Sequence, residues 1–150
     1  MGAPFRLQTV LELAARRLEV ATVELQKLRA RLQQAQEKLD QLQGYRAEYE
    51  ASLAAALAQG LPADRLRDFH AFLAKLARAI EAQGAEVARS RQAWEEEHQR
   101  WLRLRSREQA LHVLRTRHEH SESVRDARAE QKQQDEFALR GVTQGRDRKA

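Results

Sequence analysis

The sequence predicts an all-α protein: a long two-helix antiparallel coiled coil (an α-hairpin) whose C-terminal helix overhangs its partner. Apolar residues recur at alternating spacings of four and three along two long stretches, which is the pattern of a coiled-coil seam. One Gly-Leu-Pro segment separates the two stretches. The composition agrees with long helices, because 33% of the residues are charged and only 5% are aromatic.

The first helix is predicted over about residues 5–58. Its seam residues are Leu7, Leu11, Ala14, Leu18, Ala21, Leu25, Leu28, Leu32, Ala35, Leu39, Leu42, Arg46, Tyr49, Leu53 and Ala56. Only Arg46 interrupts their apolar character. A repeat of seven with two apolar positions keeps one stripe of a helix facing its partner, so this segment is predicted to be a single helix.

A bend is predicted over residues 59–64, and a second helix over about residues 65–140. Gly60 suits the left-handed position after a helix, Pro62 cannot continue one, and Asp64 can cap the next. The second seam consists of Leu66, Phe69, Leu73, Leu76, Ile80, Gln83, Val87, Ser90, Trp94, Glu97, Trp101, Leu104, Glu108 and Leu111. We expect its polar members to fix the register of the pair, and Trp94 and Trp101 to pack against the first helix.

A short connection makes the two helices antiparallel neighbours, with paired residue numbers that add to about 123. Leu7 then pairs near residue 116, where the second seam fades after Leu111 and Leu114. Residues 1–140 therefore form one predicted coiled-coil domain, in which the helix from Arg115 onward overhangs. Gly141 and Gly145 are expected to end this helix and leave residues 141–150 as a flexible tail.

Several classes of function are unsupported by the residues. The net charge of +5 is spread evenly over residues 1–60, 61–114 and 115–150, so no basic face for nucleic acid is indicated. No phosphate-binding glycine loop and no helical histidine pair occur, and two helices offer no cleft for catalysis. We therefore expect no enzymatic activity, no metal and no cofactor. The longest uncharged apolar run, residues 53–58, is too short to span a membrane, and we expect a soluble intracellular protein.

One flank of the predicted pair carries apolar residues where charges are usual. With the seam at positions a and d of the repeat, Tyr45, Phe72 and Ala79 fall at position g, and Tyr49 and Leu76 lie beneath them in the seam. In an antiparallel pair the g positions of both helices share one flank, as in the ion pair expected between Lys38 and Glu86. An exposed apolar patch indicates a partner site. The alternative is a core that widens around a helix irregularity at Gly44.

Short motifs along nearly the whole chain resemble one family. They are Phe5-Arg6-Leu7-Gln8 with Leu11; Tyr45 and Tyr49; Gly60; Phe72, Leu76 and Ala79; and the stretch Gln131-Lys132-Gln133-Gln134-Asp135-Glu136-Phe137-Ala138. These residues resemble the FliJ family of bacterial flagellar export.

The resemblance implies a non-enzymatic component of the flagellar type III export apparatus, similar to the γ stalk of rotary ATPases. It implies insertion into the hexamer of the export ATPase FliI, contact with the export gate protein FlhA, and escort of export chaperones. Such a protein is a cytoplasmic monomer that associates peripherally with the inner membrane. No nucleic acid or small-molecule substrate is implied.

The resemblance also implies two sets of binding residues. The export-gate set is Leu42, Tyr45, Tyr49, Phe72, Leu76, Ala79 and Gln83, although Lys38 and Gln83 stand where relatives often carry Gln and His. The ATPase-ring set is Phe5, Leu7, Gln8, Leu11, Gln131, Asp135, Glu136 and Phe137. Two alternatives remain at this point: the equivalent stalk of a virulence-type injection system, and a structural coiled-coil scaffold that dimerises.

Overall fold

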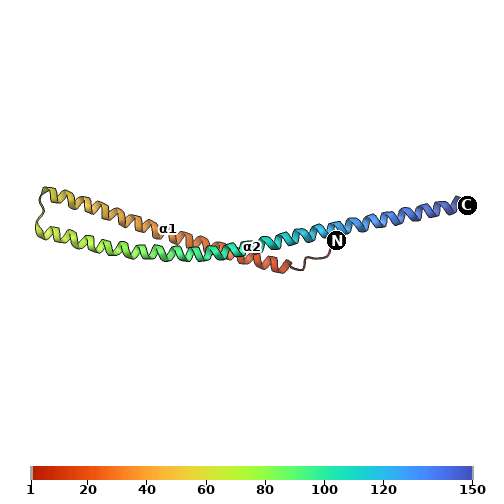
Figure 1. Cartoon of the computed structure of the whole chain (residues 1–150), viewed down its shortest axis with the longest axis horizontal. Helices are drawn as coiled ribbons and strands as arrows, with labels where there is room; N and C mark the ends of the chain where they lie inside the picture. The colour runs from red at the N-terminus through yellow and green to blue at the C-terminus, as the bar shows by residue number, and fades with distance from the viewer. Residues whose placement is uncertain (1, 150) are drawn as a thin grey trace. The chain divides into compact units, whose positions relative to one another are not determined.

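The computed structural model describes residues 2–149, with side chains described up to Arg146, and these residues form two helices and no strand. Helix α1 spans Gln8–Gln59 and α2 spans Ala63–Lys149, and they run in opposite directions from the bend that joins them (Figure 1). The chain divides into two compact units. The bend unit is Glu19–Leu102, and the terminal unit combines Met1–Leu18 with Arg103–Ala150. The predicted all-α hairpin is confirmed.

The bend is shorter than predicted. Gly60 adopts a φ of 90°, which is the left-handed conformation expected after a helix, and its amide donates to the Leu57 carbonyl. Helix α2 already begins at Ala63, with the Leu66 amide donating to the Pro62 carbonyl over 3.0 Å. The prediction that Asp64 caps α2 is therefore wrong, because Asp64 lies inside the first turn. In that position its carboxylate still interacts favourably with the positive end of the helix dipole.

The predicted seam is the buried stripe of both helices. Every one of its positions is buried or half-buried except Leu7, which is 38% exposed. In the bend unit, Ala21, Ala35, Leu76 and Val87 are the buried apolar residues. The alternation of four and three thus identified the contact face in both helices, because only these side chains can leave water when one helix covers another.

Cross-helix contacts give the register of the pair. In the bend unit, the Trp101 indole nitrogen donates to the Thr22 hydroxyl over 2.9 Å, and these residue numbers add to 123. The Gln83 amide donates to the Ala35 carbonyl over 2.9 Å, and these numbers add to 118. The predicted value of about 123 therefore holds at one end of this unit and falls by about five toward the bend. Gln83 shows how a polar seam residue fixes register, since its bond requires one particular carbonyl.

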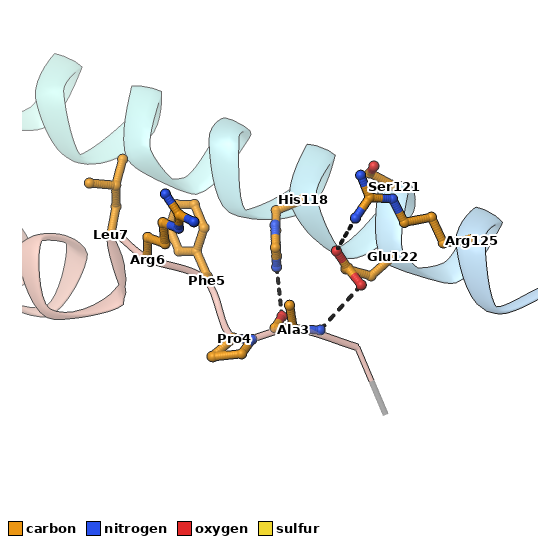
Figure 2. Close-up of a pocket in the computed structure, with 9 residues that line it drawn as sticks. All are labelled: Ala3, Pro4, Phe5, Arg6, Leu7, His118, Ser121, Glu122 and Arg125. Atoms are coloured by element: carbon orange, nitrogen blue, oxygen red, sulfur yellow. Dashed lines mark hydrogen bonds and ion pairs between the residues drawn. The ribbon is translucent and has the colours of Figure 1, made fainter.

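The terminal unit extends farther along α2 than the sequence indicated. Its core is a cluster of Leu11, Ala14 and Leu111, with Val10 packed against it. Beyond Leu111 the same spacing continues through half-buried polar residues, namely Arg115, His118 and Glu122. His118 and Glu122 lie against residues 3–7, which precede α1 (Figure 2). The apolar seam fades after Leu111 and Leu114, as expected. The expectation that α2 overhangs from Arg115 onward is wrong, because residues 3–7 lie against it as far as Glu122.

The remainder of α2 has no covering element. Residues 125–146 are all exposed, as expected for an overhang. The expectation that Gly141 and Gly145 end the helix is wrong, because α2 continues through both to Lys149. A glycine in a helix interior costs about 1 kcal/mol relative to alanine but does not stop the helix unless the backbone turns left-handed. Gly60 is the only glycine with positive φ in the part of the chain that the structure describes. A flexible tail over residues 141–150 stays a prediction.

Replacement of Leu11 by Ala should lower the free energy of unfolding by about 2–3 kcal/mol, because a leucine that is 3% exposed leaves a cavity in a thin core. The matched control is Leu13→Ala, where the side chain is 47% exposed and the expected loss is below about 1 kcal/mol. Urea unfolding followed by circular dichroism measures both. Equal losses would mean that Leu11 is not a core residue.

Candidate docking surfaces

The predicted apolar flank is exposed in the bend unit. Tyr45 is 49% exposed and Phe72 is 44% exposed, and Ala79 is exposed as well. The Tyr45 hydroxyl accepts a hydrogen bond from the Gln41 amide at 3.1 Å, which holds the phenol along the surface of α1. We call Tyr45, Phe72 and Ala79 the aromatic flank.

The seam residues beneath the aromatic flank support it. The Tyr49 ring lies between two phenylalanines of α2, with its centroid 5.0 Å from that of Phe69 and 4.3 Å from that of Phe72. Leu76 is buried and Leu42 is half-buried. Tyr49 and Leu76 are therefore packing residues, whereas Phe72 contacts Tyr49 and also reaches solvent. The predicted export-gate set thus consists of an exposed part and a supporting part.

Ion pairs mark the end of this flank that is farther from the bend. The guanidinium of Arg31 lies 3.4 Å from the Glu86 carboxylate, and that of Arg89 lies 2.8 Å from it. The hydrogen bond from Arg89, with its charge and that of Arg31, holds the pKa of Glu86 below its ordinary value. The expected ion pair between Lys38 and Glu86 is therefore wrong, because the local register places Arg31, and not Lys38, opposite Glu86.

That register also brings the aromatic flank together. The numbers of Arg31 and Glu86, both at position g, add to 117. The same offset sets Tyr45 level with Phe72, and Lys38 level with Ala79. Gln83 faces inward from this flank, and its side-chain amide donates a hydrogen bond to the Ala35 carbonyl. It therefore helps to fix the register of the two helices and does not form an exposed polar rim.

A helix irregularity at Gly44 does not explain the apolar flank. Helix α1 is continuous through Gly44, and a Cβ placed there would meet no atom within 4 Å. The exposed aromatic side chains are consequently a feature of the surface and not of a widened core. Whether they bind a partner stays a prediction.

The predicted ATPase-ring residues all belong to the terminal unit but fall in two separate places. At the start of the chain, Phe5 lies against the His118 ring at 5.6 Å, Leu7 is exposed, Gln8 is bonded to Glu12, and Leu11 is buried. Farther along α2 the side chains are exposed: Gln131 donates to Asp135 over 3.1 Å, Glu136 is exposed, and Phe137 is 80% exposed. Leu11 and Phe5 serve packing, whereas Phe137 and its neighbours are free for contacts.

Sequence reasoning missed the contact between the start of the chain and α2. The Ala3 amide donates to the Glu122 carboxylate at 3.2 Å, and the Ala3 carbonyl lies 2.8 Å from the His118 ring nitrogen (Figure 2). An open hollow of about 520 Å³ lies between residues 3–7 and this part of α2. The seam spacing does continue through Arg115, His118 and Glu122, but polar residues at these positions do not by themselves indicate a backbone partner.

The two tryptophans of the second seam serve packing, as expected. Trp94 and Trp101 are half-buried, and the His98 ring stacks between them with centroid distances of 4.8 and 6.1 Å.

Among the described residues, no cluster of His, Cys, Asp or Glu side chains has the geometry to hold a metal ion. Neither helix, over its described residues, contains an apolar segment that could cross a membrane.

The fold and these surfaces define a class: a coiled-coil helical hairpin that presents apolar side chains along one flank and continues as an uncovered helix. Within that class, the family model described as "Flagellar FliJ protein" matches residues 3–147, and the chain belongs to the FliJ family. The flagellar FliJ proteins of Salmonella typhi and of Escherichia coli K12 are each 29% identical to it over 136 residues, covering 91% of this chain and 92% of theirs. No solved structure gives a significant match to the chain.

Replacement of Tyr45 by Ala should change the free energy of unfolding by less than about 0.5–1 kcal/mol, because half of its surface is already in water. Tyr49→Ala should cost about 3 kcal/mol, because it removes a ring packed between Phe69 and Phe72. Urea unfolding of the two variants makes the comparison. A large loss for Tyr45→Ala would show that it belongs to the core and not to a docking surface.

Proposed function

We propose that this chain is a non-enzymatic component of the bacterial flagellar type III export apparatus. It inserts as a central stalk in the hexamer of the export ATPase FliI, promotes assembly of that ring, contacts the export gate protein FlhA and escorts export chaperones. The observation that carries the proposal is the match to the FliJ family over residues 3–147. The relatives that cover almost the whole chain carry the flagellar FliJ name.

The geometry supports a stalk in two ways. Residues 125–146 of α2 are all exposed and bear charges of both signs, so this helix can be surrounded by other subunits without first uncovering a core of its own. Interspersed charges favour contacts that can be exchanged, since each exposed ion pair contributes only about 0–1 kcal/mol. A stalk that meets non-equivalent subunits of a ring benefits from such weak, replaceable contacts.

The geometry also supports a separate contact with the export gate. The aromatic flank belongs to the bend unit, whereas the predicted ring residues belong to the terminal unit. Large aromatic side chains that are half-exposed are frequent anchors of protein interfaces. A protein with one docking surface in each unit can bind both the ATPase and the gate.

The test of the stalk role is the steady-state rate of the export ATPase from the same organism, measured with and without this protein. We expect a rise in rate that saturates near stoichiometric addition and accompanies ring formation in electron micrographs. Truncation after Val124 should abolish the effect, because it removes the exposed helix that begins at residue 125 and keeps the part of α2 that contacts residues 3–7. No effect on rate or assembly, together with no binding to the ATPase, would contradict the stalk and favour a scaffold or an injection-system stalk.

The test of the gate contact is the double variant Tyr45→Ala with Phe72→Ala. We expect it to lose binding to the soluble part of FlhA by tenfold or more, because two neighbouring anchors contribute above about 1 kcal/mol each. Its stimulation of the ATPase should be unchanged. The control is Leu57→Ala, an apolar side chain of the same unit that is 50% exposed near the bend. Equal binding to FlhA by the wild type, the double variant and the Leu57→Ala control would contradict a gate contact at the aromatic flank.

A further inference from the structure

The terminal unit also carries apolar residues at a flank position where coiled coils usually have charged ones. Val10 and Leu114 occupy position g of their repeats, as Tyr45 and Phe72 do in the bend unit. Val10 packs against the Leu11–Ala14–Leu111 cluster, while Leu114 is 43% exposed. Leu13, one turn from Val10 on the outer side of α1, is 47% exposed. An apolar surface is therefore available in this unit as well.

A small notch lies in this surface between the two helices. It is lined by Val10, Leu13 and Ala14 with Arg17 from α1, and by Leu104 and Arg107 from α2. Its volume is about 20 Å³, the size of a single water-sized group, so it cannot hold a small-molecule ligand. It can seat the end of one apolar side chain of a partner protein. We call these residues the arginine-flanked notch.

The two arginines of the notch are available for a partner. Neither Arg17 nor Arg107 has an ion-pair or hydrogen-bond partner among the residues that the structure describes. Glu108, which neighbours Arg107, is engaged by His112 at 2.8 Å, and Glu12, near Leu13, interacts with Gln8. The notch thus combines exposed apolar atoms with two guanidinium groups whose charge is not neutralised locally.

The charge of the chain is concentrated in the same unit. The terminal unit contains 15 Lys and Arg against 9 Asp and Glu, a net charge of +6. The bend unit contains 12 Lys and Arg against 13 Asp and Glu, a net charge of −1. The even spread found along the sequence is therefore not preserved in the folded units, because the terminal unit joins both ends of the chain. Its field favours an acidic partner surface.

We infer that the arginine-flanked notch is a second contact with the export ATPase, beside the exposed helix, and that it takes an acidic segment of the ATPase in which one apolar side chain is flanked by carboxylates. This inference rests on the proposed function and adds the chemistry of the contact. The apolar side chain enters the notch against Leu13, and the carboxylates pair with Arg17 and Arg107. Forked guanidinium groups suit carboxylates at such a rim.

The experiment measures binding of the full-length chain to the purified export ATPase by calorimetry, with two pairs of matched variants. Arg17→Glu is compared with Arg16→Glu, which makes the same charge change at the neighbouring outward position. Leu13→Gln is compared with Val113→Gln, since Val113 is 50% exposed but faces away from the notch. Circular dichroism checks that helix content is unchanged in all four.

We expect Arg17→Glu and Leu13→Gln each to weaken binding by about tenfold or more, and both controls to bind within about twofold of the wild type. Added salt should weaken wild-type binding more than that of Arg17→Glu. Weaker binding with Arg17→Glu alone would overturn the notch as the docking site, because it would indicate only a general attraction to an anionic surface. Weaker binding with Leu13→Gln alone would overturn the inference that the partner segment is acidic. Equal binding by all variants would overturn the inference while leaving the proposed function intact, whereas no binding by the wild type would overturn both.

Discussion

The pairing of two antiparallel helices along an unbroken seam is the constraint on which the other features depend. Each helix can bury only one stripe, since a single partner covers it, and the rest of its surface stays in water. The seam decides which side chains lie beside it at position g, and the register decides which of them meet across the pair. The ion pair of Arg31 with Glu86 and the bond from Gln83 to the Ala35 carbonyl follow from that register.

A pair of helices also limits what the protein can do. Because each helix buries only the stripe that faces its partner, the flanks and the uncovered part of α2 are the surfaces left for recognition. The aromatic flank arises where apolar residues replace charged ones at position g, whereas the notch keeps arginines at that position beside exposed apolar atoms. Around Tyr45 and Phe72 the neighbours are aromatic, while around Leu13 they are arginines. The difference in charge between the two units gives the two surfaces different preferred partners.

The sequence predicted the features that depend on periodicity and missed those that depend on single backbone choices. Every predicted seam position but Leu7 is buried or half-buried, because burial repeats with the helix and needs no knowledge of the turn. The aromatic flank followed from the same repeat. The role of Asp64 was missed because α2 begins two residues earlier than predicted, which moves the expected cap into the first turn. The extension of α2 past Gly141 was missed because a glycine permits a helix end without requiring one. The contacts of Ala3 with His118 and Glu122 use backbone atoms, which leave no pattern in side-chain identity.

The register can be tested directly because the natural chain contains no cysteine. Arg31→Cys with Glu86→Cys places two thiols across the pair in the bend unit, and Arg31→Cys with Arg100→Cys moves the second thiol two heptads, about 21 Å, along α2. Treatment with a short bismaleimide should join the first pair within one chain and leave the second pair unjoined, as judged by mass spectrometry of the intact protein. Efficient joining of the second pair, or a product of twice the mass from the first, would contradict the intrachain hairpin and the flanks that depend on it.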